Sequence, residues 1–238
     1  MNTIPLDMAR AVAADECEAA GVTLLTPESL SVLRTAAYLT VTATTPLTLA
    51  QAQQRVSLYV PRLAADVADL ARLAVPALGG VLALDRPCIV VGEGAWGDGP
   101  LLVGVIAHEL GHHRRDLATR GGLGVVGSAL WGLAYLTHPA VRLWEEGTCY
   151  TCDVTAAVVL RGVDPLAAGD DAERSLRSIY RADPLSFAIG SDAIRSCVAS
   201  LRARQLHGTD TSIHRVLRAL VKRGWDAGAW ASVIGDAS

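Results

Sequence analysis

The pair His108 and His112 constrains the fold most, because it ties two residues four positions apart to one surface. On an α-helix such residues lie on one face, so both imidazoles can reach a single metal ion. Glu109 lies beside that face, where its carboxylate can take a proton from a metal-bound water molecule. A helix with two surface histidines is the alternative interpretation, but the run VGVIA before the motif is typical of a buried helix. We therefore expect this helix at the centre of the fold.

The composition allows one compact domain and excludes several classes of protein. The chain has 238 residues, of which 51% are hydrophobic and 19% charged, so it can form a core and does not resemble a disordered chain. A net charge of −3 provides no basic surface for nucleic acid. The dispersed cysteines and the acidic N-terminal segment, which lacks the apolar run of a secretory signal, predict a cytoplasmic protein. The expected single domain, 1–238, has a helical N-terminal part (1–80), a metal-site core (81–162) and a helical C-terminal part (163–238).

Hydrophobic spacing, capping residues and glycines predict a mostly helical chain. The predicted helices are 6–20, 26–38, 48–78, 101–118, 121–137, 139–160, 170–181, 185–206 and 210–234. We expect an interruption near Pro61 in the third of these and a break near Gly224 in the last. The segment 40–47 is β-branched and interrupted by proline, as in a loop or short strand. Two short apolar runs within 81–96 predict a small β-sheet, and Cys88–Val91 is the strongest strand. The predicted fold class is mostly α (α+β), a helical bundle around the histidine helix.

A third metal ligand must come from elsewhere, because catalytic zinc usually has three protein ligands and a water molecule. A second predicted helix carries the run Glu145-Glu146-Gly147-Thr148-Cys149. HExxH followed on another helix by an acid, glycine, any residue and a small residue resembles the gluzincin metallopeptidases. The resemblance implies a zincin-like fold, a Zn²⁺ cofactor and Glu146 as the third ligand, with small residues that let the two helices approach closely. Glu145 is the alternative ligand.

A second resemblance covers the same region. The run HELGHHRRD, a hydrophobic stretch, Pro139 and an acid-rich helix ending in Cys152-Asp153 are similar to the HtpX-like membrane metallopeptidases. Those families place the ligand glutamate four residues before the aspartate, a position that is Cys149 here. Because of this departure, Glu146 remains the predicted ligand. Asp153 lies two turns after it on the same face, so it can accept the second N–H of a metal-bound histidine.

Other residues near the motifs have structural alternatives. Asp116, four residues after His112, can orient a histidine or pair with a nearby arginine. His113 points to another face and is expected to be structural or solvated. Cys149 and Cys152 form a C-x-x-C pair, for which packing between helices is favoured over a redox or zinc site. Such peptidases commonly use a tyrosine or histidine to stabilise the oxyanion. The candidates are Tyr135, Tyr150, Tyr180, His138, His207 and His214.

The uncharged, glycine-rich segment 121–137 allows two interpretations. A membrane-spanning helix needs about 20 apolar residues, and this segment is shorter. A single crossing would also separate Glu146 from His112, although the site needs both. We therefore favour a buried or docked helix over insertion into a membrane.

Together these features predict a zinc-dependent metallopeptidase that acts on a peptide or protein substrate. His108, His112 and Glu146 would hold Zn²⁺, and Glu109 would act as the general base. The strand Cys88–Val91 would form the edge of the sheet, with which an extended substrate pairs. The alternatives are a zincin-like regulatory protein without turnover and a membrane-associated regulatory peptidase.

Overall fold

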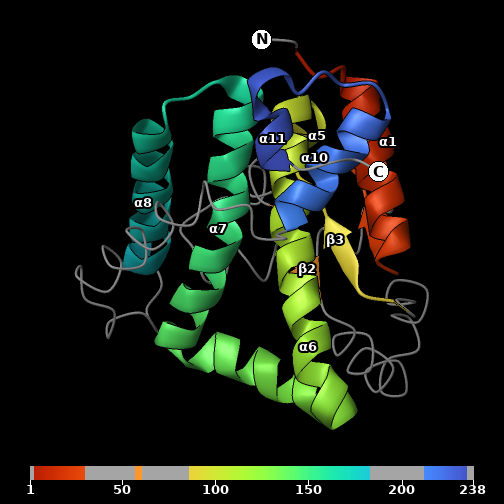
Figure 1. Ribbon diagram of the computed structural model, residues 1–238. Helices are drawn as coiled ribbons and strands as arrows, with labels where there is room; N and C mark the ends of the chain where they lie inside the picture. The colour runs from red at the N-terminus through yellow and green to blue at the C-terminus, as the bar shows by residue number, and fades with distance from the viewer. Residues whose placement is uncertain (1–2, 30–56, 61–85, 183–211, 235–238) are drawn as a thin grey trace.

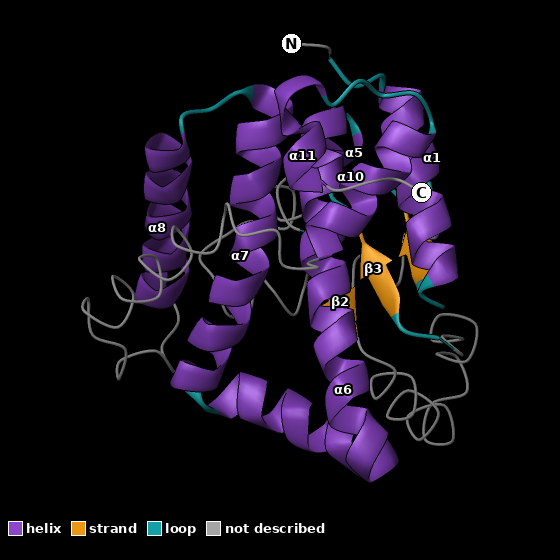
Figure 2. Ribbon diagram, in the orientation of Figure 1, coloured by secondary structure: helices purple, strands orange, loops and turns teal. Residues whose placement is uncertain are grey.

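The computed structural model describes residues 3–29, 57–60, 86–182 and 212–234. Most of these residues are helical, which confirms the predicted mostly α fold class (Figures 1 and 2). The helices are α1 (Leu6–Ala19), α5 (Glu93–Trp96), α6 (Gly99–Thr137), α7 (Pro139–Arg161), α8 (Pro165–Ala182), α10 (Ser212–Lys222), the 3₁₀ helix η3 (Gly228–Trp230) and α11 (Ala231–Ile234). Most of the predicted helix 26–38, the helix 185–206 and the segment 40–47 lie outside the described residues.

The small sheet has three strands in the order β1 (Thr23–Leu25), β3 (Cys88–Val90) and β2 (Leu58–Val60). β1 runs parallel to β3, and β2 runs antiparallel to it. The predicted strand at Cys88–Val91 is confirmed, but its predicted place at the edge of the sheet is wrong. β3 binds a strand on each side and is fully buried, so it cannot pair with a substrate.

β2 differs from its prediction. The sequence predicts helix over 48–78, whereas Leu58–Val60 is an extended strand, and the remaining residues of that range lie outside the described part. The tripeptide contains an aromatic and a β-branched side chain, which suit a strand. Its backbone pairs with β3, a contact distant in the sequence that local helical spacing does not register.

α6 is one helix where the sequence predicts two, 101–118 and 121–137. It begins after Asp98, whose side chain accepts a hydrogen bond from the Leu101 N–H (3.0 Å), and Pro100 occupies its first turn. Figure 1 shows the helix turning sharply, so that its second half runs toward the start of α7. Glycines are common where helices bend, and this segment is rich in them.

Side-chain contacts require this turn. In a straight helix, the stretch from His112 to Tyr135 would span about 35 Å. The rings of these two residues lie only 6.0 Å apart, centre to centre. Trp131 stacks on Tyr135 at 5.5 Å, so the second half of α6 returns to the histidines and covers one side of them. Among the described residues, no helix is both long enough and apolar enough to cross a membrane.

The main core lies where α6 packs against α1, α10 and the sheet. Fully buried members of this core are Val12 of α1, Ile89 of β3, Leu102 and Ile106 of α6, and Leu217 of α10. α7 packs along another side of α6, as Figure 1 shows. The core therefore fixes one side of α6. The polar site lies on another side, at the interface between α6 and α7, which we call the α6–α7 seam.

Small residues set the distance between α6 and α7. A methyl group on Gly104 would lie 3.1 Å from Cβ of Ala156, and one on Gly111 would lie 3.0 Å from Sγ of Cys149. Both distances are shorter than ordinary van der Waals contacts, so a larger residue at either glycine would separate the helices. The close approach occurs at two glycines of α6, and one of them, Gly111, lies opposite Cys149, the small residue of the predicted second motif.

The C-terminal helices largely follow their predictions. α7 ends at Gly162, whose φ of +65° is a left-handed conformation that favours glycine. The predicted helix 170–181 lies within the longer α8. The predicted helix 210–234 is interrupted near Gly224, as expected, because this residue has a φ of +93°.

Substituting Gly104 by alanine tests the seam. We expect Gly104→Ala to lower the free energy of unfolding by about 1–3 kcal/mol, because the new methyl group overpacks against Ala156. Gly121→Ala is the matched control, since nothing lies within 4 Å of its new methyl group. The control should gain up to about 1 kcal/mol from helix propensity. Urea denaturation measures both, and equal stability of the two variants would contradict the proposed packing.

Candidate metal centre

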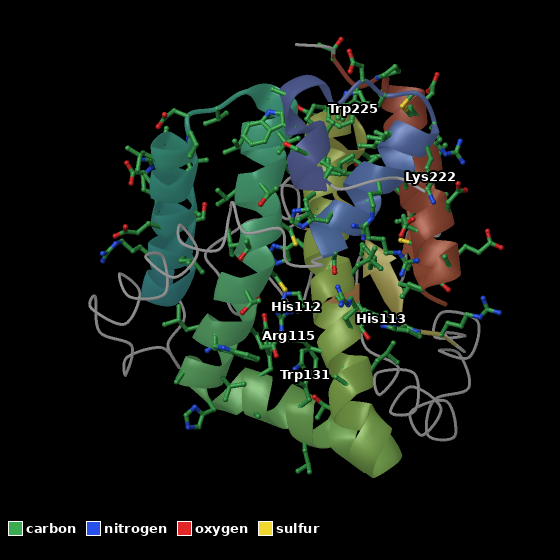
Figure 3. The ribbon with its side chains drawn as sticks, in the orientation of Figure 1. His112, His113, Arg115, Trp131, Lys222 and Trp225 are labelled. Carbon is green, nitrogen blue, oxygen red and sulfur yellow. The ribbon has the colours of Figure 1, made fainter. Side chains whose placement is uncertain are left out.

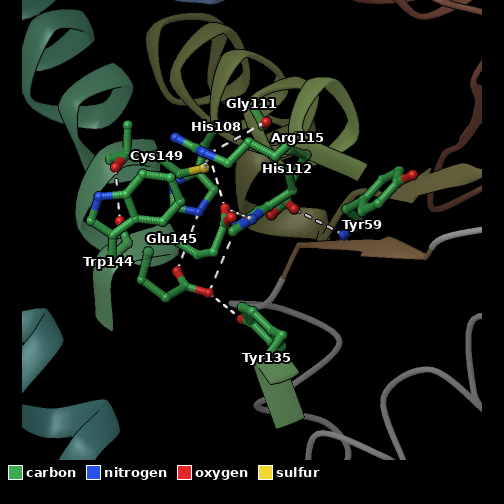
Figure 4. Close-up of polar contacts among 12 residues, drawn as sticks. Tyr59, His108, Gly111, His112, Arg115, Tyr135, Trp144, Glu145 and Cys149 are labelled. Atoms are coloured by element: carbon green, nitrogen blue, oxygen red, sulfur yellow. Dashed lines mark hydrogen bonds and ion pairs between the residues drawn. The ribbon is translucent and has the colours of Figure 1, made fainter. Parts of the chain in front are cut away.

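The polar site lies between α6 and α7 (Figures 3 and 4). His108 and His112 come from the first half of α6, with ring centres 5.1 Å apart. Figure 3 shows His112, Arg115 and Trp131 gathered between the two helices, while His113 lies on the side of α6 toward the sheet. The structure therefore brings the two predicted histidine ligands together, facing α7.

Asp153 fixes the orientation of His108. Its Oδ2 lies 2.6 Å from Nδ1 of His108, so only Nε2 of this imidazole remains for a metal ion. A carboxylate in this position determines the tautomer and the ring orientation of a metal-binding histidine. Asp153 is thus placed where the sequence predicts it, across the seam from α6.

Glu146 lies between the two histidines. Its Oε2 is 3.5 Å from Nε2 of His108, and its Oε1 is 3.6 Å from Nε2 of His112. The hydroxyl of Tyr135 donates a hydrogen bond to Oε1 and holds the carboxylate in place. Ligand atoms of one tetrahedral Zn²⁺ lie about 3.4 Å from one another. Each imidazole–carboxylate distance is close to this value, but the two contacts use different oxygens, and Glu146 is outside the group of described residues whose ligand atoms all lie within 4.8 Å of one another.

Cys149 joins the same cluster, although the sequence favours a packing role for it. Its Sγ and one ring nitrogen each of His108 and His112 lie within 4.8 Å of one another, so these three residues could hold a metal ion. The Nη1 atom of Arg115 donates to Sγ at 3.1 Å. Cys149 and Cys152 are both free thiols, and Cys152 is outside this group. The signal for Cys149 in the sequence is its place four residues before Asp153.

Glu145, the alternative ligand, lies behind the histidines. Its Oε2 forms an ion pair with Arg115 (3.1 Å), and its Oε1 accepts a hydrogen bond from Nε1 of Trp131 (3.1 Å). It approaches Nδ1 of His112 at 3.8 Å, on the opposite side of the ring from Glu146. Figure 4 shows this network of contacts around Cys149. Glu145 is thus suited to anchoring the second half of α6, whereas its separation from His112 is longer than a hydrogen bond.

Glu109 is buried and points toward the sheet. Its Oε2 accepts a hydrogen bond from the backbone N–H of Tyr59 on β2, at 2.8 Å (Figure 4). Burial raises the pKa of Glu109, and the positive charges of His108 and His112 partly oppose this effect. The predicted general base therefore lies between the histidines and the strand at the edge of the sheet.

Burial and neighbouring negative charges shift the pKa values of His108 and His112 in opposite directions. Burial alone would lower their pKa values, but Asp153 and Glu146 raise the pKa of His108 well above its ordinary value. Cys149 and Glu146 similarly raise the pKa of His112 to about 10. Although burial would raise the pKa of Glu146, the histidines lower it to about 2. The cluster therefore favours positive charge at its centre, as a cation site must.

His113 and Asp116 form a separate network. The Tyr59 hydroxyl donates to Oδ2 of Asp116 (2.8 Å) and lies 3.1 Å from Nδ1 of His113. Nε2 of His113 lies 3.1 Å from the carbonyl oxygen of Ala20. The structural role expected for His113 is consistent with these contacts. Asp116 thus accepts the hydrogen bond of this tyrosine.

The structure places two of the residues predicted to stabilise the oxyanion, Tyr150 and Tyr135, beside the metal cluster. Tyr150 lies edge-on to the His108 ring at 5.2 Å, and Tyr135 reaches Glu146. His138 is exposed at the junction of α6 and α7, and His214 is buried on α10. The last two candidates are Tyr180, near the end of α8, and His207, which lies outside the described residues.

Comparison with known proteins finds no relative: no family model, curated protein or solved structure matches the chain. The site must therefore be interpreted from its own chemistry.

The pKa of His112 predicts how pH changes the stability of the metal-free protein. The folded state binds this proton more tightly than the unfolded state, with a pKa of about 10 against 6.5. Its contribution is complete below pH 6.5 and is lost as the pH rises toward 10. We expect the free energy of unfolding in urea to fall over this interval, and to fall less steeply in His112→Gln. A stability that rises from pH 6.5 to 10 would contradict this charge balance.

Proposed function

We propose that the chain is a zinc-dependent metallopeptidase of the gluzincin type. In this proposal His108, His112 and Glu146 hold Zn²⁺, and Asp153 orients His108. The observation that carries the proposal is the approach of two Nε2 atoms to one carboxylate, at 3.5 and 3.6 Å. The negative surroundings of the imidazoles support a divalent cation at this point.

Glu109 would move the proton in this reaction. Bound Zn²⁺ would polarise the scissile carbonyl and lower the pKa of a water molecule. Glu109 would accept a proton from the attacking water and deliver it to the leaving amine. Its hydrogen bond to the Tyr59 N–H holds the carboxylate next to His108 on α6 while leaving Oε1 for this transfer.

β2 supports a peptide as the substrate. It pairs with β3 on one side, and in the described part of the chain no strand pairs with its other side. The Tyr59 N–H on that other side points to Glu109. Glu109 occupies this N–H, so an extended peptide that adds to the edge of β2 would have to take the place of the carboxylate there and would lie directly beside it. In this proposal β2 takes the role that the sequence assigns to Cys88–Val91.

Metal analysis of the purified protein tests the ligand set. We expect about one zinc ion per chain in the wild type, because three protein ligands make a stable site. His108→Ala and Glu146→Ala should lose most of the metal. His138→Ala is the matched control. This histidine is exposed at the end of α6, so the variant protein should keep its zinc. If Glu146→Ala keeps zinc while Glu145→Ala loses it, the assigned third ligand is wrong.

Replacing Glu109 tests turnover separately from metal binding. Glu109→Gln should keep its zinc but lower peptide hydrolysis by a factor of about 10²–10⁴, because general base catalysis is lost. Mass spectrometry of a peptide library, read for new termini, measures this. Hydrolysis that is unchanged in Glu109→Gln would refute the proposed base. A wild type that binds zinc and cleaves nothing in the library would favour the regulatory alternative.

A further inference from the structure

The thiol of Cys149 has no role in the peptidase proposed above, although it lies within the same cluster. Its Sγ is close to one ring nitrogen of each histidine, within the 4.8 Å group of His108, His112 and Cys149. Glu146 and Cys149 are three residues apart on α7, so both face the histidine pair from the same side. Cys149 is only 1% exposed, so solvent does not separate its thiol from the histidines.

A positively charged side chain lies beside the sulfur of Cys149. The guanidinium of Arg115 donates a hydrogen bond to Sγ at 3.1 Å and fixes the position of the sulfur near α6. Because Gly111 has no side chain, Sγ of Cys149 can lie close to the backbone of α6; a methyl group on Gly111 would be only 3.0 Å from it. Both observations concern α6, the helix that carries the histidines.

Cys152 shows that this arrangement is specific to one cysteine of the pair. It lies on the same helix and is equally a buried free thiol. Its side chain belongs to the main hydrophobic core, and it is outside the metal-binding group. Cys152 therefore provides a matched control for Cys149.

We propose that Cys149 is a further ligand of the metal ion held by His108, His112 and Glu146, and that it closes the site at rest. This inference rests on the proposed function, because it concerns the same ion. Four protein ligands complete a tetrahedral zinc site, whereas a catalytic site keeps one position for water. The thiol releases its proton to solvent when the sulfur–metal bond forms. When water displaces the sulfur, that bond breaks, the thiolate regains a proton from solvent, and the site opens.

Cobalt spectroscopy of the full chain tests this inference. After removal of bound metal and loading with Co²⁺, a thiolate ligand produces a sulfur-to-cobalt charge-transfer band in the near ultraviolet. We expect the band in the wild type and in Cys152→Ala. It should be lost in Cys149→Ala and in Cys149→Ser, which keeps the size of the side chain, while Co²⁺ stays bound to the other ligands. Peptide hydrolysis per bound metal should rise in both Cys149 variants, because the position for water is then permanently open.

Two results would overturn the assignment. One is a wild-type protein that binds Co²⁺ without the charge-transfer band, and the other is a band that persists in both Cys149 variants. If the Cys149 variants do not fold, absence of the band in the wild type still refutes a thiolate ligand, and loss of the band in Cys152→Ala refutes Cys149 as that ligand. A band without hydrolysis in any metal-loaded form would instead refute the peptidase and leave the thiolate ligand established. Hydrolysis without a band would refute the ligand alone.

Discussion

The close contact between α6 and α7 is the constraint on which the site depends. The histidines come from one helix and their acidic partners from the other, so the ligand distances follow from the separation of the two axes. Helices with ordinary side chains at their interface pack about 8–10 Å apart. Gly104 opposite Ala156 and Gly111 opposite Cys149 allow direct approach at two points, one on each side of His108. The seam is thus narrow where Asp153 must reach His108, at 2.6 Å.

The seam also buries an excess of negative charge. Glu145 and the partly buried Glu146 lie within it, the buried Glu109 lies beside it toward the sheet, and Arg115 pairs with Glu145. A buried carboxylate without a positive partner costs several kcal/mol. The folded chain therefore needs further positive charge at this point, which protons on the imidazoles or a divalent ion can supply. Protons and metal compete for the same nitrogens, so the electrostatics that stabilise the metal-free fold are also those that prepare the site for a cation.

The sequence could predict the parts of the site that follow from local periodicity. Spacing along single helices is enough to bring His108 and His112 to one surface, with Glu109 beside it, and to place Asp153 two turns beyond Glu146. The return of Trp131 and Tyr135 to the histidines could not be predicted in this way. It depends on a bend in α6, and hydrophobic spacing indicates only that both segments are helical.

Contacts distant in the sequence account for the other differences. β2 is three residues long, too short for an alternating pattern, and it forms because β3 offers an edge for pairing. The same pairing makes Cys88–Val91 a central strand. The sequence favours packing for Cys149 because spacing along α7 does not indicate what lies opposite it, and the structure shows packing against Gly111 together with proximity to the histidines.

Tyr59 explains how so short a strand can be held accurately beside the site. Its backbone N–H binds Glu109, while its hydroxyl binds Asp116, two turns further along α6. Two contacts with one helix fix both the position and the tilt of β2. His113 joins the same hydroxyl to the carbonyl oxygen of Ala20, just after α1, and so connects the strand to the main core. The histidine that follows His112 thus serves the site indirectly, because it helps to hold the strand whose backbone binds Glu109.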